Sequence, residues 1–113
     1  MDVAWHDPQL VTSEIMDGYG KSFRTPHWEQ AMWEIVMARE QAHLDERLST
    51  VQVPVLVVSG DDDRLVPLEQ SQLLSRQLQQ AEMVVISRCG HIPPEERPAQ
   101  FLAALTDFVR RLA

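Results

Sequence analysis

The sequence predicts an α/β protein with two parallel β-strands, a helix crossing between them, and a helical segment ahead of them. Residues 53–58 form an apolar, β-branched run that ends at Ser59 and Gly60, and residues 83–86 form a second apolar run. Continuous apolar runs of this length are typical of parallel strands that are buried on both faces. The polar segment between the runs begins at Pro67 and is long enough for a crossover helix.

Ionisable side chains follow both predicted strands. Asp61, Asp62 and Asp63 come directly after the first strand, and His91 follows the second. In open α/β sheets, ligands bind at the carboxyl ends of the strands. An aspartate that orients a histidine there forms the base half of a Ser-His-Asp triad. The alternatives are a solvated turn for the aspartates and a loop histidine bonded to backbone.

The first 49 residues carry helical signals and no strand pattern. Thr12 is a suitable N-cap for a short helix that Gly18 and Gly20 would end. Thr25 followed by Pro26 predicts the start of a longer helix. The apolar residues of this longer helix predict a face buried in the core, or else side chains that line a substrate pocket. They are Trp28, Ala31, Met32, Trp33, Ile35, Val36 and Met37.

A change in composition near Thr50 predicts a boundary between residues 1–49 and residues 50–113. A short charged helix over residues 43–49 leads up to it. In the crossover helix beyond the boundary, Leu73, Leu74 and Leu78 are expected to face the sheet.

The carboxyl-terminal part of the chain predicts a rigid loop followed by an amphipathic helix. The loop is the proline-rich segment 93–98. Arg110 and Arg111 lie at the end of the helix, where cations are favoured. The helix carries an apolar stripe formed by Phe101, Leu102, Leu105, Phe108, Val109 and Leu112.

Composition excludes several classes of partner. The formal net charge is −7 and Lys21 is the only lysine, so the clustered cations that bind nucleic acid are absent. Cys89 is the only cysteine, which favours a reducing cytoplasm. The first residues lack a signal-peptide pattern, and no run approaches the about 20 apolar residues of a membrane span. We therefore expect a cytoplasmic chain without a nucleic-acid or membrane partner.

Two motifs resemble those of the α/β-hydrolase family. Residues 53–67 resemble its penultimate strand and acid turn, whose usual form is P-hydrophobic-G-x-x-D-x-hydrophobic-V-P. Residues 89–98 resemble its histidine loop, G-H-x-P-x-E-x-P. The resemblance implies that Asp63, four residues before Pro67, is the catalytic acid and that His91 is the base. We therefore expect Asp63, and not Asp61 or Asp62, to approach His91.

The resemblance covers residues 50–113 closely and residues 1–49 more loosely. The earlier segment resembles part of the helical cap, or lid, that precedes the penultimate strand in this family. Tyr19, Trp28 and the approach from Leu48 to Val51 are in keeping with it. The implied fold is a partial α/β-hydrolase fold: a cap segment followed by the last two parallel strands, their crossover helix and the terminal helix.

The chain departs from the family in lacking a nucleophile motif. The family's serine lies on a G-x-S-x-G elbow ahead of the acid and base. The chain has four glycines, and no two of them flank a serine in this pattern. The oxyanion-hole loop and most of the family's strands are missing as well. The chain therefore resembles the carboxyl-terminal portion of a hydrolase, for which a truncated reading frame is the simplest account.

The resemblance implies a serine-dependent, esterase-like enzyme that acts on a small-molecule ester or related acyl substrate, with no cofactor or metal. In the full-length enzyme His91 would act as general base and then general acid, and Asp63 would hold its tautomer. The family also contains dehalogenases, epoxide hydrolases, peptidases and carbon–carbon hydrolases, so the fold does not identify the substrate. This chain alone is expected to be inactive, because Ser59 and Cys89 are poor substitutes for the missing nucleophile.

The main alternative is a non-catalytic fragment or an interaction module with a fold derived from the same family. The intact acid and base loops favour the enzyme, whereas the absent elbow favours the module. In either case, two strands are marginal without further cover and leave sheet edges that can pair with another chain, so the isolated chain is expected to be poorly stable or to self-associate.

Two further site hypotheses are weaker. A metal or phosphoacceptor site at residues 61–63, as in receiver-like folds, requires a lysine on a later strand, but Lys21 precedes both strands. A zinc site would have to use histidines that lack any known ligand spacing. These are His6, His27, His43 and His91.

Overall fold

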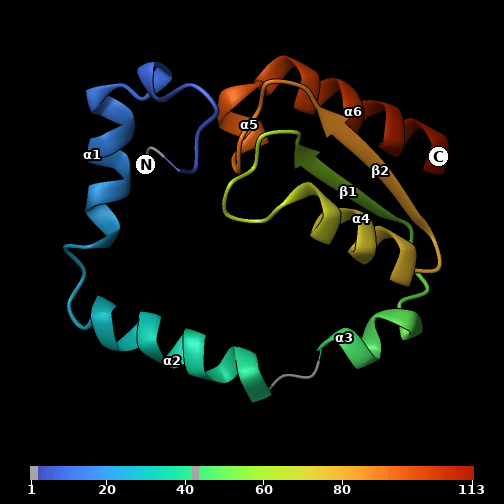
Figure 1. Ribbon diagram of the computed structural model, residues 1–113, viewed down its shortest axis with the longest axis horizontal. Helices are drawn as coiled ribbons and strands as arrows, with labels where there is room; N and C mark the ends of the chain where they lie inside the picture. The colour runs from blue at the N-terminus through green and yellow to red at the C-terminus, as the bar shows by residue number, and fades with distance from the viewer. Residues whose placement is uncertain (1–2, 42–43) are drawn as a thin grey trace.

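A computed structural model describes residues 3–41 and 44–113, and it shows a curved arm of helices followed by a compact α/β unit (Figure 1). The arm consists of α1 (Ser13–Ser22), α2 (Trp28–Gln41) and α3 (Leu44–Arg47). The α/β unit consists of β1 (Val55–Gly60), α4 (Leu68–Gln77), β2 (Ala81–Ile86), α5 (Pro93–Glu96) and α6 (Pro98–Leu112). Two 3-10 turns, Pro8–Leu10 and Leu48–Thr50, precede α1 and β1 respectively.

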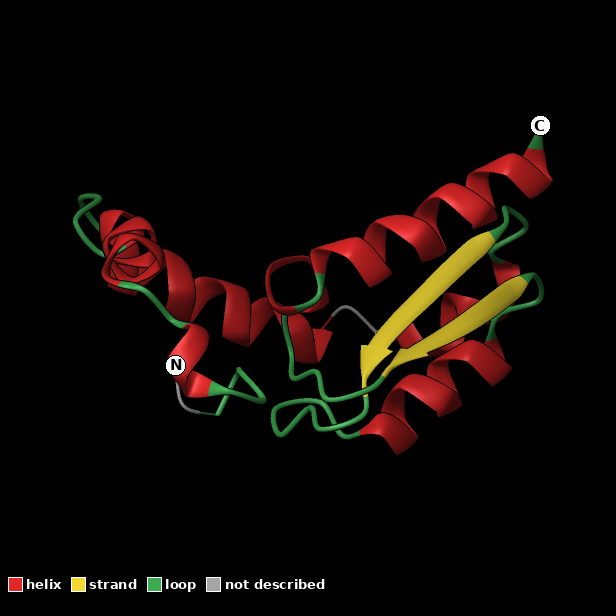
Figure 2. Ribbon diagram, turned by 90° about the horizontal axis from the view of Figure 1, so that it is seen from above, coloured by secondary structure: helices red, strands yellow, loops and turns green. Residues whose placement is uncertain are grey.

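The two strands pair in parallel, as predicted. Val55 lies opposite Ala81 and Gly60 lies opposite Ile86, with α4 as the connection between the strands. Helices α4 and α6 contact both strands from opposite faces, so the unit has three layers (Figure 2). Its core is small: Val57 in β1 is 9% exposed and Ile86 in β2 is 3% exposed.

Burial on this sheet is incomplete, so the prediction of strands buried on both faces is wrong for the chain as it folds here. Val85 in β2 is exposed. The stripe of α6 buries Phe108, but Leu102 and Val109 are exposed. In α4, Leu73 and Leu74, which were expected to face the sheet, are both exposed. The cause is the width of the sheet: two strands give too little surface to cover two amphipathic helices.

The start of α1 is correctly predicted, but its end is not. Thr12 Oγ1 accepts a hydrogen bond from Ile15 N at 3.3 Å, as an N-cap does. The helix continues through Gly18 and Gly20 to Ser22, because neither glycine adopts the left-handed backbone that ends a helix.

Two proline-containing segments also differ from prediction. Helix α2 begins at Trp28 rather than at Pro26, because His27 adopts a left-handed backbone with φ of 63° and interrupts the helical path. The segment expected to be a rigid loop after His91 contains the helical turn α5, which begins at Pro93. Proline suits the first turn of a helix, where its missing N–H is not needed.

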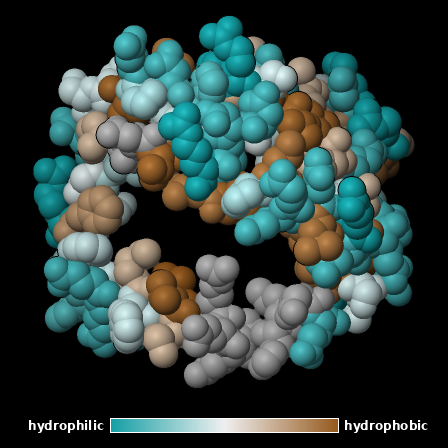
Figure 3. Space-filling view, in the orientation of Figure 1, coloured by the Kyte–Doolittle hydropathy of each residue, from teal (hydrophilic) through white to brown (hydrophobic). Residues whose placement is uncertain are grey.

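The arm leaves the predicted core face of α2 uncovered. Trp33 is 65% exposed and Ile35 is 64% exposed, and Met32 is exposed as well, so the prediction that this face is core is wrong in this chain. The arm curves away from the sheet and leaves an open space between α2 and the α/β unit (Figure 3). The predicted helix at 43–49 is observed as α3 and a 3-10 turn, and residue 43 lies outside the described residues.

The overall dimensions show how much surface stays exposed. The radius of gyration is 16.2 Å, compared with about 13 Å for a compact domain of this size. The accessible surface is 8463 Å², whereas a compact monomer of this mass exposes about 6300 Å². The excess, about 2000 Å², is the area that one partner buries in a large obligate interface.

Candidate active site

The loops that follow β1 and β2 pack directly on each other at the carboxyl edge of the sheet. We call residues 61–67 the acid loop and residues 87–92 the histidine loop. The backbone N–H of Asp62 donates to the carbonyl of Cys89 at 3.0 Å. Gly60 permits this approach, because a Cβ at that position would lie 2.2 Å from the carbonyl oxygens of Cys89 and Gly90. The strand ends therefore hold the two loops within hydrogen-bonding distance.

The structure brings together the aspartate and the histidine that the sequence paired. Nδ1 of His91 lies 2.9 Å from Oδ2 of Asp63. The side chain of Asp63 is 7% exposed and that of His91 is 39% exposed, so the carboxylate is sheltered and the imidazole is accessible. A carboxylate acceptor at Nδ1 favours the tautomer that carries its proton on Nδ1 and leaves Nε2 free to accept a proton.

The carboxylate of Asp63 is fixed by its own loop. Its Oδ1 accepts hydrogen bonds from the backbone N–H groups of Leu65 and Val66, both at 2.9 Å. Burial by itself would raise the pKa of Asp63, but the bonds from Val66, His91 and Leu65 outweigh it and hold the pKa below its usual value. Asp63 is therefore ionised near neutral pH and can orient the imidazole.

The three consecutive aspartates have different partners. Asp61 Oδ1 accepts a hydrogen bond from the backbone N–H of Cys89 at 3.3 Å. Asp62 Oδ2 lies 2.9 Å from Nδ1 of His6 and 2.8 Å from Nη2 of Arg64. The hydrogen bond with His6, followed by that with Arg64, lowers the pKa of Asp62. Each carboxylate is thus engaged separately, which does not fit a shared metal or phosphoacceptor site.

Sequence reasoning missed the residues at the start of the chain that join this site. Ala4 O accepts a hydrogen bond from His91 N at 2.7 Å, and His6 contacts Asp62. Trp5 is 2% exposed, and its indole Nε1 has no hydrogen-bond partner among the described residues, so its contribution is packing. These contacts join positions 56 or more residues apart, and no periodic pattern in the sequence indicates them.

Neither candidate substitute nucleophile is available. Ser59 is 4% exposed, and its hydroxyl donates to the carbonyl of Gly60 at 3.3 Å. Cys89 is fully buried; burial, followed by the charge of Glu96, raises the pKa of its thiol to about 11. A thiol with that pKa carries almost no thiolate at neutral pH.

The histidines considered as zinc ligands are separated. His6 and His91 pair with different aspartates, and His27 lies in the turn before α2. His43 lies outside the described residues. Within residues 3–41 and 44–113, no group of three histidine, cysteine, aspartate or glutamate side chains is placed to hold a metal ion. In the same ranges, none of the helices has the length and apolar character needed to cross a membrane.

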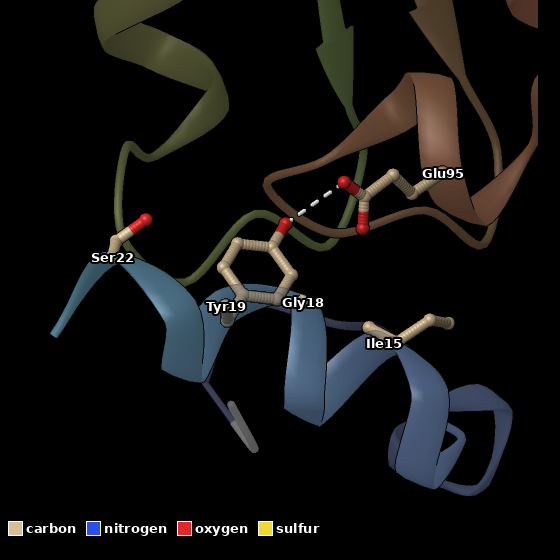
Figure 4. A pocket seen from close by; sticks show the side chains of 5 residues that line it. All are labelled: Ile15, Gly18, Tyr19, Ser22 and Glu95. Atoms are coloured by element: carbon tan, nitrogen blue, oxygen red, sulfur yellow. Dashed lines mark hydrogen bonds between the residues drawn. The ribbon is translucent and has the colours of Figure 1, made fainter. Parts of the chain in front are cut away.

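An open pocket of about 560 Å³ lies between α1 and α5 (Figure 4). Tyr19 projects from α1, and its hydroxyl donates to Oε1 of Glu95 at 2.9 Å. Burial and the neighbouring Glu95 raise the pKa of Tyr19. The remaining lining comes from α1: Ile15, Gly18 and Ser22. This hydrogen bond ties the arm to the segment just after His91.

A second, smaller pocket of about 250 Å³ lies where α1 meets α2. Trp28 lies edge-on to Phe23 there, with ring centroids 4.9 Å apart. Ala31 and Met32 also line it, so part of the apolar face of α2 borders a pocket rather than a core.

Comparison with known proteins places the chain among hydrolases. The model of the alpha/beta hydrolase family matches residues 2–105. The uncharacterized hydrolase YugF of Bacillus subtilis is 32% identical over 105 residues, which cover 93% of this chain and 38% of that protein. The chain spans about two fifths of the length of the curated relatives it matches.

Solved structures agree with this placement. The 2-hydroxy-6-oxo-6-phenylhexa-2,4-dienoate hydrolase from Rhodococcus sp. strain RHA1 is 28% identical, with a TM-score of 0.72 over 96% of this chain and 41% of that chain. A thermophilic esterase from Thermogutta terrifontis is 31% identical, with a TM-score of 0.58 over 59% of this chain and 25% of that chain.

The family model covers most of the sequence, and the two-stranded unit with its helices fits part of the α/β-hydrolase fold. The expected family and fold class are therefore confirmed. The chain belongs to the alpha/beta hydrolase family and represents a carboxyl-terminal portion of its fold.

Proposed function

We propose that this chain supplies the acid and base of a serine-dependent α/β hydrolase. The observation that carries the proposal is the 2.9 Å contact between His91 Nδ1 and Asp63 Oδ2. The other oxygen of this carboxylate accepts hydrogen bonds from two backbone N–H groups. In the whole enzyme, Nε2 of His91 takes the proton of the serine and later returns it to the leaving group, while Asp63 stabilises the imidazolium that forms between these steps.

The nucleophile must then come from a part of the hydrolase outside these 113 residues. The sequence contains no G-x-S-x-G elbow, and Ser59 and Cys89 are both buried. The matched relatives are more than twice as long as the segment they share with this chain, which supports such an origin. The surface that this chain exposes in excess of a compact monomer would pack against this missing part.

We further propose that residues 1–49 act as a cap over a small-molecule ester or related acyl substrate. The pocket between α1 and α5 lies in the size range of ligand sites, about 300–1000 Å³, and it borders the segment after His91. Ile15 offers an apolar wall, and Tyr19 and Glu95 offer polar groups that can orient a substrate. The similarity to an esterase supports an ester, and the similarity to a dienoate hydrolase makes dienoates the competing substrate class.

A chimera tests the proposal. The chain replaces the matched segment of the Bacillus subtilis hydrolase, and turnover of an activated aryl ester is measured. Asp63→Asn is expected to lower kcat by on the order of 10⁴, and His91→Ala by at least as much, while Arg64→Gln keeps the activity. Equal turnover by the His91→Ala chimera and the unsubstituted one would contradict the proposal. Turnover of a dienoate without turnover of esters would change the substrate class and leave the roles of the two residues in place.

The isolated chain provides the complementary control. Because triad members act as a unit, a positioned base without a nucleophile should show no ester turnover above that of His91→Ala. Turnover clearly above that control would show that a group within these residues acts as nucleophile.

The second candidate function is a non-catalytic interaction module with the same fold. The large exposed surface and the apolar face of α2 favour it. It predicts a chimera that folds with its two parts packed together. The turnover of this chimera would be low, and His91→Ala would leave it unchanged.

A further inference from the structure

The residues at the start of the chain form a short clasp on both loops of the candidate site. We call residues 4–6 the N-terminal clasp. Trp5 anchors it in the core with 2% of its surface exposed. On one side, Ala4 O accepts the backbone N–H of His91 at 2.7 Å. On the other, His6 Nδ1 lies 2.9 Å from Asp62 Oδ2, in the residue next to Asp63.

A buried carboxylate completes the clasp. Glu96 is 5% exposed, and each of its oxygens accepts one backbone N–H. Oε1 accepts that of Gly90 at 2.7 Å, and Oε2 accepts that of His6 at 2.9 Å. Hydrogen bonds to an ionised acceptor are roughly twice as strong as neutral ones. Glu96 therefore joins the residue just before His91 to the clasp.

The fit between clasp and histidine loop is close. A Cβ added to Gly90 would lie 2.5 Å from Ala4 O and 2.8 Å from both His6 N and Glu96 Oε1. The histidine loop therefore has little room to move relative to the clasp.

We propose that His6 and Glu96 are positioning residues for the Asp63–His91 pair. His6 reaches the acid loop through its imidazole and the histidine loop through its backbone N–H and Glu96. One residue thereby fixes the relative position of the two loops that carry the acid and the base. The inference rests on the proposed function, because it assumes that the Asp63–His91 pair is catalytic. A displacement of catalytic groups by about 1 Å is enough to slow a reaction strongly.

The positioning role makes a prediction that a purely structural role does not. If the clasp only stabilises the fold, removing its bonds lowers stability but leaves the Asp63–His91 contact intact in the folded molecules. If it positions the pair, the folded variant loses the preference of His91 for the Nδ1–H tautomer. The side chain of His6 is 29% exposed, so replacing it by a polar residue leaves no fully buried gap.

The experiment is nitrogen-15 NMR of the histidine rings in the full chain. His6→Gln removes the imidazole and keeps the backbone N–H, and Glu96→Gln removes the charge and one of the two acceptors. Arg64→Gln is the matched control, because Arg64 is the other partner of Asp62 Oδ2 and its ion pair in the described residues is with Asp62 rather than with the clasp. We expect His91 to be mainly Nδ1–H in the unsubstituted chain and in Arg64→Gln. The ratio of Nδ1–H to Nε2–H should fall at least twofold in His6→Gln and in Glu96→Gln.

Amide exchange gives a second measurement on the same samples. The amides of Leu65 and Val66, which donate to Asp63, should exchange several-fold faster in His6→Gln and at the original rate in Arg64→Gln. If Glu96→Gln does not fold, His6→Gln decides alone. An unchanged His91 tautomer in folded His6→Gln, or loss of folding in that variant, would overturn the proposal and leave His6 a structural residue. Neither readout needs turnover, so an inactive chimera would count against the proposed function and not against this inference.

Discussion

The polar groups at the strand ends find hydrogen-bond partners within this chain, whereas the apolar faces of the helices stay largely exposed. Glu96 is 5% exposed and has a hydrogen-bond donor for each oxygen, whereas Trp33 on α2 is 65% exposed. Hydrogen bonds are short and directional, so a few loop residues can complete one another. Hydrophobic burial scales with area, and a single two-stranded sheet between two helices does not supply enough of it.

The geometry of the Asp63–His91 pair and the stability of the fold therefore depend on different regions of the chain. The Asp63–His91 contact depends on loops that the chain itself holds together. The apolar faces of α2 and α6 require a further surface, which the proposed hydrolase partner segment or a second copy of the chain can provide. Substitutions in the two regions should therefore have different consequences.

The largest effect is expected from a matched pair of glycine substitutions. In Gly60→Ala, the new Cβ would meet two backbone carbonyls at 2.2 Å, and neither can move without separating the loops. We expect a loss of about 3 kcal/mol or more in the free energy of unfolding. In Gly18→Ala, the Cβ meets nothing within 4 Å inside a helix, so a gain of about 0.5–1 kcal/mol is expected. Urea melts measure both. Similar losses for the two variants would show that the loops do not pack more closely than the arm.

The strands and the site were predictable because their signals are local in sequence. The two apolar runs indicate parallel strands, and the resemblance to the acid turn and histidine loop of the α/β-hydrolase family selects Asp63 and His91 among the residues that follow them. The clasp was not predictable, because His6 and Asp62 are 56 positions apart and single side chains carry no periodicity. The exposure of Ile35 was not predictable either. A helical stripe shows that a face is apolar but does not show whether a partner for it is present.

A smaller effect distinguishes the covered from the uncovered apolar surface. Phe108 on α6 is 8% exposed, and Phe108→Ala should cost about 3 kcal/mol, because it leaves a cavity against the sheet. Ile35 on α2 is 64% exposed, and Ile35→Ala should change the free energy of unfolding by at most about 0.5 kcal/mol. Chemical denaturation at low protein concentration tests this, and a large loss for Ile35→Ala would mean that α2 has an intramolecular partner in solution.

The smallest effect concerns acid. The pKa of Asp63 is lower in the folded chain than its unfolded value of about 3.9. Its ionisation therefore stabilises the fold above that value, and this contribution is lost as the pH falls through the folded pKa. The urea midpoint should be steady between about pH 7 and 5 and fall below about pH 4. The urea midpoint of Asp63→Asn should fall less steeply over the same window. The pKa of Asp62 is lowered too, but Asp62 is present in both proteins, so it does not account for the difference between them. Parallel losses would mean that Asp63 is not held ionised by its neighbours.

The claim that the acid and histidine loops are complete within this chain while its apolar surface is left uncovered is tested most directly by sedimentation of the isolated chain. Unpaired edges of β1 and β2 and the open face of α2 predict association with another copy. We expect the average mass to rise with protein concentration, and urea unfolding to depend on that concentration. A monomer of constant mass with a single cooperative transition that is independent of concentration would contradict the claim, because these residues would then form a self-sufficient domain.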